Sequence, residues 1–84
     1  MARQEESVSL KRVHAQYLES LRAAAELPAG LTLNGEVLEG PRVAMEALRD
    51  QLTETLAERG FGEDYSITAE GALIEELIDA LHLP

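Results

Sequence analysis

The sequence predicts a mainly α-helical fold: a three-helix domain with a short β-hairpin between the first and second helices. Three segments carry apolar residues at helical spacing, and the pair Asn34-Gly35 stands between the first two of them. The chain has 84 residues, of which 45% are hydrophobic, and no cysteine. It therefore fits one small helical domain over residues 1–84 whose core is held by packing alone, and we expect residues 1–6 to be flexible.

The first helix is expected over residues 7–26, because apolar residues there fall within about 140° when counted at 100° per residue. Ser7 or Ser9 could cap its start, and the sequence LPAG from Leu27 ends it. The apolar stripe consists of Val13, His14, Tyr17, Leu18, Leu21, Ala24 and Ala25. We interpret His14, which lies inside this stripe, as a histidine at the edge of the core rather than as a ligand.

A β-hairpin is predicted in the sequence LTLNGEVL, because an Asn-Gly pair between short apolar runs is the strongest local signal for a type I′ turn. With Asn34 and Gly35 as the two central residues, Leu33 would face Glu36. A two-stranded ribbon is only marginally stable by itself, so it would have to lie on the helices.

The second helix is expected over residues 41–59, with Pro41 at its first position, where a missing N–H group costs nothing. At its other end, Gly60 is suited to the left-handed conformation, with Phe61 packing back on Leu56. The predicted buried stripe contains Ala44, Met45, Leu48, Leu52, Thr55 and Leu56.

The third helix should begin after Thr68, a good N-cap, with Glu70 near the positive end of the helix dipole. Its apolar stripe spans about 160°, wider than the roughly 100° that one packing face requires. The helix is therefore either central in the core or has a partner in another chain. We expect the core to contain Leu10, Tyr17, Leu21, Leu48, Leu52, Leu56, Leu73, Leu77 and Leu81.

The charge of the chain argues against nucleic acid as a partner, since phosphate binding depends on lysine and arginine and the net charge is −9. Residues 60–84 hold six carboxylates and neither lysine nor arginine, so the acidity belongs mainly to the C-terminal third. No apolar run is long enough to span a membrane, and the N-terminus lacks a signal sequence. We expect a cytoplasmic protein without membrane contact.

The segment GEDYSITAEG has the outline of a calcium loop, with Asp64, Ser66, Thr68 and Glu75 at the positions of an EF-hand. However, Ala69 stands where the loop needs glycine for its sharp turn, and the predicted helix would begin inside the loop. We therefore predict no metal ion and no other cofactor.

The same segment, from Asp64 to Leu77, resembles the modified-serine region of acyl carrier proteins, which are also small, acidic and helical. The resemblance implies a carrier role for Ser66. The sequence departs from that pattern because Asp64 does not immediately precede Ser66, and because no further helices follow.

We predict that the protein is not an enzyme, since no catalytic constellation or nucleotide-binding loop is evident, and that no residue is catalytic. The favoured function is a protein-interaction or assembly module that forms a homodimer through the third helix. The alternative is an acidic adaptor, inhibitor or nucleic-acid mimic that docks a basic protein. Ile74, Ile78 and Leu81 are the candidate binding residues near the dimer axis, with Glu75, Glu76 and Asp79 at the rim.

Overall fold

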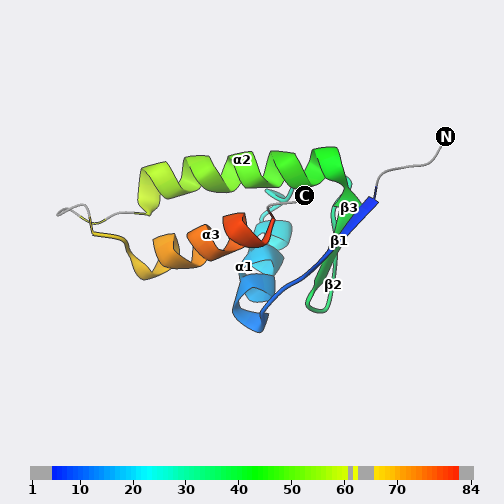
Figure 1. Cartoon of the computed structure of the whole chain (residues 1–84), viewed down its shortest axis with the longest axis horizontal. Coiled ribbons are helices and arrows are strands. Elements are labelled where there is room, and N and C mark those ends of the chain that lie inside the picture. The colour runs from blue at the N-terminus through cyan, green and yellow to red at the C-terminus, as the bar shows by residue number, and fades with distance from the viewer. Residues whose placement is uncertain (1–4, 61, 63–65, 82–84) are drawn as a thin grey trace. The chain divides into compact units, whose positions relative to one another are not determined.

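The computed structural model of the chain describes residues 5–60, 62 and 66–81, and these form three helices and a three-stranded antiparallel sheet (Figure 1). The elements are β1 (Glu5–Ser9), α1 (Arg12–Ala23), β2 (Thr32–Asn34), β3 (Val37–Pro41), α2 (Arg42–Arg59) and α3 (Ala69–Ala80). The three predicted helices and the hairpin between the first two are confirmed. The fold is a mixture of helices and sheet rather than a helical domain with a ribbon alone, because β1 joins the hairpin.

The chain divides into two compact units, Met1–Leu48 and Arg49–Pro84. The first unit contains the sheet, α1 and the start of α2, and the second contains the rest of α2 and α3. Helix α2 is continuous through the boundary between them. That residues 1–84 form a single domain stays a prediction.

Strand β1 lies where we expected a flexible tail and the start of the first helix. It pairs antiparallel with β3, so that Ser7 lies opposite Glu39. Exposure alternates along the strand, with Ser7 and Ser9 exposed and Val8 buried between them, as in a half-buried strand. The prediction of a helix starting at residue 7 is therefore wrong, because a partner strand distant in sequence captures this segment. Of the tail predicted to be flexible, residues 1–4 lie outside the described residues.

Helix α1 begins later than predicted, with Lys11 as its N-cap and no side-chain hydrogen bond at the cap. Its buried residues are His14, Ala15, Leu18 and Leu21. The predicted apolar stripe is correct at its centre but wrong at Val13, which is 47% exposed, and at Ala24 and Ala25, which follow the helix and are exposed. The buried face is narrower than the stripe and is displaced toward Ala15.

The C-terminus of α1 is closed by a non-glycine residue in the left-handed conformation. Ala25 has a φ of 59°, and its N–H donates to the carbonyl of Arg22 at 3.0 Å. The next N–H, that of Glu26, donates to the carbonyl of Leu21 at 2.8 Å. These two bonds form a Schellman motif, in which glycine is the usual residue at the position of Ala25. The helix therefore ends at Ala23, before the LPAG sequence that we expected to stop it.

The hairpin between β2 and β3 is present, but its register differs by one residue in the turn. Asn34 pairs with Val37 and Leu33 with Leu38, so the central turn residues are Gly35 and Glu36. Gly35 has a φ of 64°, whereas Glu36 does not have a positive φ. A positive φ at the first central position alone is typical of a type II′ turn, which glycine at that position allows. The shift places Leu33 and buried Leu38 on one face of the sheet, which removes the imperfect alternation of the predicted register.

Helix α2 agrees with its predicted bounds within one residue, since Pro41 is the last residue of β3 rather than the first of the helix. The predicted left-handed cap at Gly60 is wrong, because Gly60 has no positive φ. Its N–H instead continues the helical pattern by donating to the carbonyl of Leu56 at 2.8 Å. The expected contact of Phe61 lies outside the described residues.

Helix α3 begins as predicted. The side chain of Thr68, in extended conformation, accepts a hydrogen bond from the N–H of Gly71 at 3.0 Å, and Glu70 lies in the first turn. In the second unit, α3 runs back along the C-terminal half of α2 (Figure 1).

The core residues of the first unit are Val8, Leu10, Ala15, Leu18, Leu21, Leu38, Ala44, Met45 and Leu48, and those of the second unit are Leu52, Ile74, Leu77 and Leu81. Six of the nine predicted core residues are buried, whereas Tyr17, Leu56 and Leu73 are only half-buried. The sheet explains part of the difference, because its buried face supplies Val8 and Leu38.

Candidate functional site

The six residues proposed for partner binding divide into two groups on α3. Ile74 and Leu81 are buried, at 0% and 2% exposure. These two are therefore core side chains and do not contribute to the surface of the chain. Ile78 is half-buried, and the carboxylates of Glu75, Glu76 and Asp79 are exposed.

A groove in the second unit brings the four accessible residues together. It has a volume of about 580 Å³ and lies between α2 and α3. Its lining consists of Thr53, Leu56, Ile67, Ala72, Glu75, Glu76, Ile78 and Asp79. The spacing explains the arrangement, because residues three and four apart on a helix share a face. The groove thus contains an apolar part, to which Leu56, Ile67 and Ile78 belong.

Four residues that line this groove were not among the predicted site residues. Leu56 had been assigned to the core, and Thr53, Ile67 and Ala72 had no role. Ile67 precedes α3 and is 42% exposed. The sequence contained no signal for it, because only the position of α3 beside α2 places Ile67 next to Leu56 and Ile78.

The ionisable residues that line the groove are all acidic. Within the described residues, Glu75 and Asp79 form no ion pair, and the last turn of α3 has no basic residue. Asp79 lies near the C-terminal end of the helix, where the dipole disfavours a negative charge. A cation brought to this end of the groove would therefore relieve an unfavourable local field.

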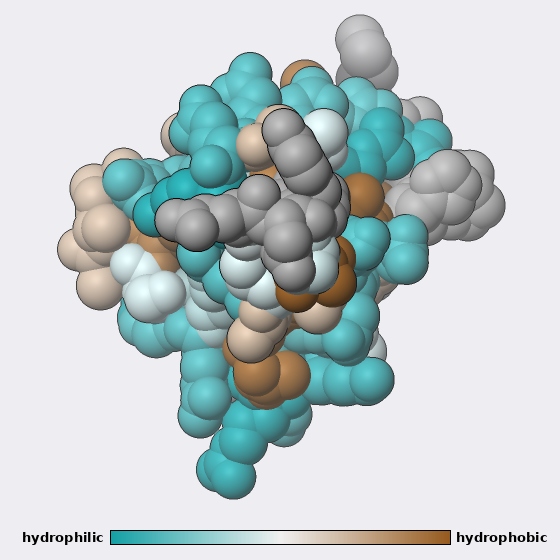
Figure 2. Space-filling view, turned by 90° about the vertical axis from the view of Figure 1, so that its left-hand side faces the viewer, coloured by the Kyte–Doolittle hydropathy of each residue, from teal (hydrophilic) through white to brown (hydrophobic). Residues whose placement is uncertain are grey.

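The face of the molecule that Figure 2 shows gives little support for a broad flat interface. Figure 2 shows one face of the molecule, on which hydrophobic atoms form small separate patches among hydrophilic ones. Large exposed hydrophobic side chains within the described part of the chain are Val13, Val43 and Ile67. Of these three, Ile67 lines the α2–α3 groove together with other apolar residues.

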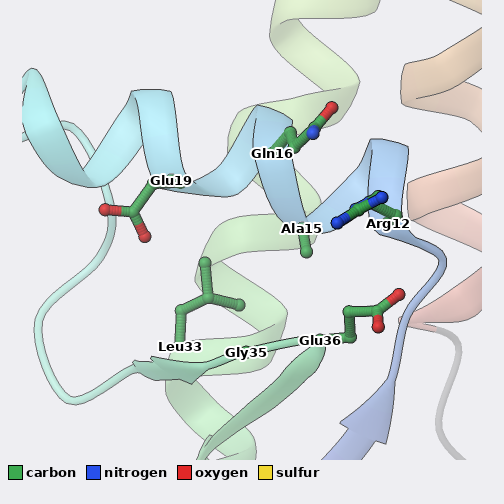
Figure 3. A pocket seen from close by; sticks show the side chains of 7 residues that line it. All are labelled: Arg12, Ala15, Gln16, Glu19, Leu33, Gly35 and Glu36. Atoms are coloured by element: carbon green, nitrogen blue, oxygen red, sulfur yellow. The ribbon is translucent and has the colours of Figure 1, made fainter.

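A second hollow, which the sequence did not predict, lies in the first unit between α1 and the hairpin. It has a volume of about 380 Å³ and is lined by Arg12, Ala15, Gln16, Glu19, Leu33, Gly35 and Glu36. Leu33 points from β2 toward α1, and Arg12 and Glu36 lie at the same end of the hollow (Figure 3). The four residues from α1 share one helix face. The hollow exists because the hairpin lies beside this face and supplies the other side of the lining.

The charges around this second hollow are balanced. Glu19 accepts a hydrogen bond from the Nε of Arg22 at 3.1 Å. This hydrogen bond and the opposite charge of Glu19 raise the pKa of Arg22 above its ordinary value. With Glu19 paired to Arg22, the remaining charges at the hollow are one guanidinium, on Arg12, and one carboxylate, on Glu36. The hollow therefore shows no preference for a ligand of either charge.

The described part of the structure gives no sign of a metal site at GEDYSITAEG, the segment with the outline of a calcium loop. Asp64 lies outside the described residues, and the oxygen of Thr68 is engaged in capping α3. Within the described residues, no three or more histidine, aspartate or glutamate side chains are grouped so as to hold a metal ion. His14 is buried at 4% exposure and lines neither of the two hollows described above.

None of the helices, as far as the chain is described, combines the length and the apolar character that crossing a bilayer requires. Comparisons with protein-family models, with curated proteins and with solved structures give no match for this chain. Nothing about its function is therefore carried over from another protein.

Proposed function

We propose that the protein is a protein-binding module whose α2–α3 groove receives a basic amphipathic helix from a partner protein. The single observation that carries the proposal is the lining of the groove, in which apolar side chains stand beside ionisable residues that are all acidic. An amphipathic helix binds such a groove by inserting apolar residues from successive turns. Lysine or arginine residues beside those anchors would meet Glu75, Glu76 and Asp79.

Charge and apolar contact would have separate roles in this complex. The apolar contact with Leu56, Ile67 and Ile78 supplies the binding free energy that is insensitive to salt. The acidic residues attract a basic partner before contact and so raise the association rate, an effect that salt screens. The acidity of the C-terminal third thus serves recognition.

The test is a titration of the full chain with a synthetic helical peptide that has leucine on one face and lysine on the other, followed by fluorescence anisotropy. Binding should weaken as salt is raised, and should weaken about tenfold or more in the double variant Glu75→Lys, Asp79→Lys. The matched control is Glu46→Lys, Asp50→Lys, which reverses two exposed charges at the same spacing outside the groove. Equal weakening in both double variants would show that the groove is not the binding site.

A second copy of the chain is the other candidate for this groove, as the sequence led us to expect. The exposed Ile67 and the half-buried Ile78 favour it, because two-fold pairing is the commonest way to cover such side chains. Self-association would bring the acidic residues of two copies together, so salt should strengthen it by screening their repulsion. Sedimentation velocity of the wild type and of Ile78→Glu at two salt concentrations tests for a dimer at the groove, since salt should strengthen a homodimer there but weaken the binding of a basic peptide. Ile78→Glu should give a folded monomer if the dimer forms here.

The proposal includes no catalytic step and no cofactor, and it places the protein in the cytoplasm. These parts rest on the sequence, namely on the lack of a catalytic constellation and on the lack of cysteine, which is typical of proteins in a reducing compartment.

A further inference from the structure

The backbone of β1 presents a row of hydrogen-bonding groups on the side away from β3. The N–H of Leu10 donates to the carbonyl of Glu36 at 2.8 Å, which fixes this position as a hydrogen-bonded one. In an antiparallel pair such positions alternate along the strand. Val8 and Glu6 therefore bond to β3, whereas the N–H and C=O groups of Ser7 and Ser9 point outward.

No strand within the described part of the chain occupies this outer side, since the sheet order is β1-β3-β2. Ser7 and Ser9 are exposed, so their outward groups are accessible. Proteins commonly protect such edges with proline, bulges or lysine, because an open edge is a template for another strand. The sequence of β1, EESVS, contains no proline or lysine, and its two charged residues, Glu5 and Glu6, both lie at the start of the strand, which leaves Ser7, Val8 and Ser9 uncharged.

We propose that β1 pairs with β1 of a second copy of the chain, antiparallel and centred on Ser7, to form a continuous six-stranded sheet. The outward groups are arranged symmetrically about Ser7, so a two-fold axis at this residue lets each copy satisfy the other. In this register Glu5 faces Ser9 of the second copy and Glu6 faces its Val8. No carboxylate lies opposite another carboxylate, which would be unfavourable.

The charges of β1 favour this register over the one centred on Glu6. A two-fold axis at Glu6 would place the two Glu6 carboxylates directly opposite each other. In the proposed register Glu6 also keeps its own counter-charge, since its carboxylate lies 3.7 Å from the guanidinium of Arg42. The segment therefore matches a second copy of itself in length, in hydrogen-bonding groups and in charge.

This pairing is independent of the proposed groove complex, because β1 belongs to the first unit and the groove to the second. The chain has no cysteine, so any disulfide that a single-cysteine variant forms with itself joins the introduced residues of two copies. Residues facing each other at a hydrogen-bonded position have Cα atoms about 5.5 Å apart, within the range that a disulfide spans. Ser7→Cys should therefore form a disulfide-linked dimer under mild oxidation, whereas Ser9→Cys, which faces residue 5, should form it far more slowly.

Sedimentation velocity gives the second test. Ser7→Pro removes the outward N–H of β1 but none of the bonds to β3, so this variant should stay folded by circular dichroism and become monomeric. Ser7→Thr keeps the N–H and should dimerise like the wild type. A wild-type chain that is monomeric throughout the micromolar range overturns the proposal. So does equal crosslinking of Ser7→Cys and Ser9→Cys, or a dimer that survives Ser7→Pro and is lost in Ile78→Glu. If Ser7→Pro fails to fold, the crosslinking comparison alone decides.

Discussion

Gly60 and Gly71 pack backbone against backbone at the connection between α2 and α3, and the Cα of Gly60 lies 2.9 Å from the position that a Cβ on Gly71 would occupy. Thr68 holds the two together. Its N–H and its hydroxyl both donate to the carbonyl of Gly60, at 2.8 and 3.1 Å, while its hydroxyl oxygen accepts from the N–H of Gly71. One threonine thus closes the end of one helix and caps the start of the next.

Gly71→Ala should lower the free energy of unfolding by about 1–3 kcal/mol, because the added methyl group would meet backbone atoms of Gly60 that cannot move aside without shifting the connection. Urea denaturation measures the change. Glu75→Ala, at an exposed position one turn later, is the control and should change stability by less than about 0.5 kcal/mol. Equal midpoints for Gly71→Ala and the wild type would mean that the two glycines are not in contact.

Thr68→Val should cost about 1 kcal/mol, because valine keeps the shape of threonine but cannot accept the hydrogen bond from Gly71 or donate to Gly60. Thr68→Ser keeps the hydroxyl and should retain most of the stability. Thermal and urea unfolding of the pair give the measurement. If serine is as damaging as valine, the methyl group rather than the hydroxyl is what matters at this position.

Ala25→Gly should stabilise the protein by about 0.5–1 kcal/mol, because glycine adopts the left-handed conformation of this residue without the steric cost that alanine has. The neighbouring Ala24 has a φ of −86°, so Ala24→Gly relieves no strain and should be neutral or destabilising. The comparison requires only two denaturation curves. A loss of stability in both variants would contradict the Schellman geometry at the end of α1.

Leu52→Ala should cost on the order of 2–5 kcal/mol, because Leu52 is 1% exposed and its truncation leaves a cavity. Val43→Ala, on the same helix at 72% exposure, should change stability by less than about 0.5 kcal/mol. A small effect of Leu52→Ala on stability would mean that Leu52 does not lie in the core and that α2 presents a different face to it.

The elements that the sequence predicted well are those with local signals. The capping of α3 by Thr68 was predicted because a threonine directly before an apolar helical pattern is a local signal that depends on no distant partner. The stretch Arg42–Arg59 is long and stands between Pro41 and Gly60, which are local signals for a helix start and end, so its bounds were predicted within one residue. The end of α1 was missed because an alanine at position 25 carries no signal for a left-handed cap.

The elements that the sequence did not predict depend on distant pairing. Strand β1 has only one buried apolar residue, Val8, and its identity as a strand comes from β3. The hairpin was expected at the right place but in the wrong register, because Asn34-Gly35 and Gly35-Glu36 are both acceptable as central turn residues. The observed register is the one that places buried Leu38 opposite Leu33.

The candidate site was predicted in part for a related reason. The width of the apolar stripe on α3 gives the amount of apolar surface, but it does not say which side chains the rest of the chain covers. Ile74 and Leu81 are covered, and Ile78 is only half-covered. Ile67 could not be recognised from periodicity, because it lies outside the helix.

The pairing of β1 with β3 also has a consequence for synthesis of the chain. A ribosome makes residues 5–9 before α1 and β2, and β3 only after them. Helix α1 can begin to form from local contacts while β1 still lacks its partner, since non-local pairing is slow. Nascent chains that end before Val37 therefore expose residues 5–9 without a partner strand, and at this stage neighbouring nascent chains on one messenger RNA are able to associate through this segment.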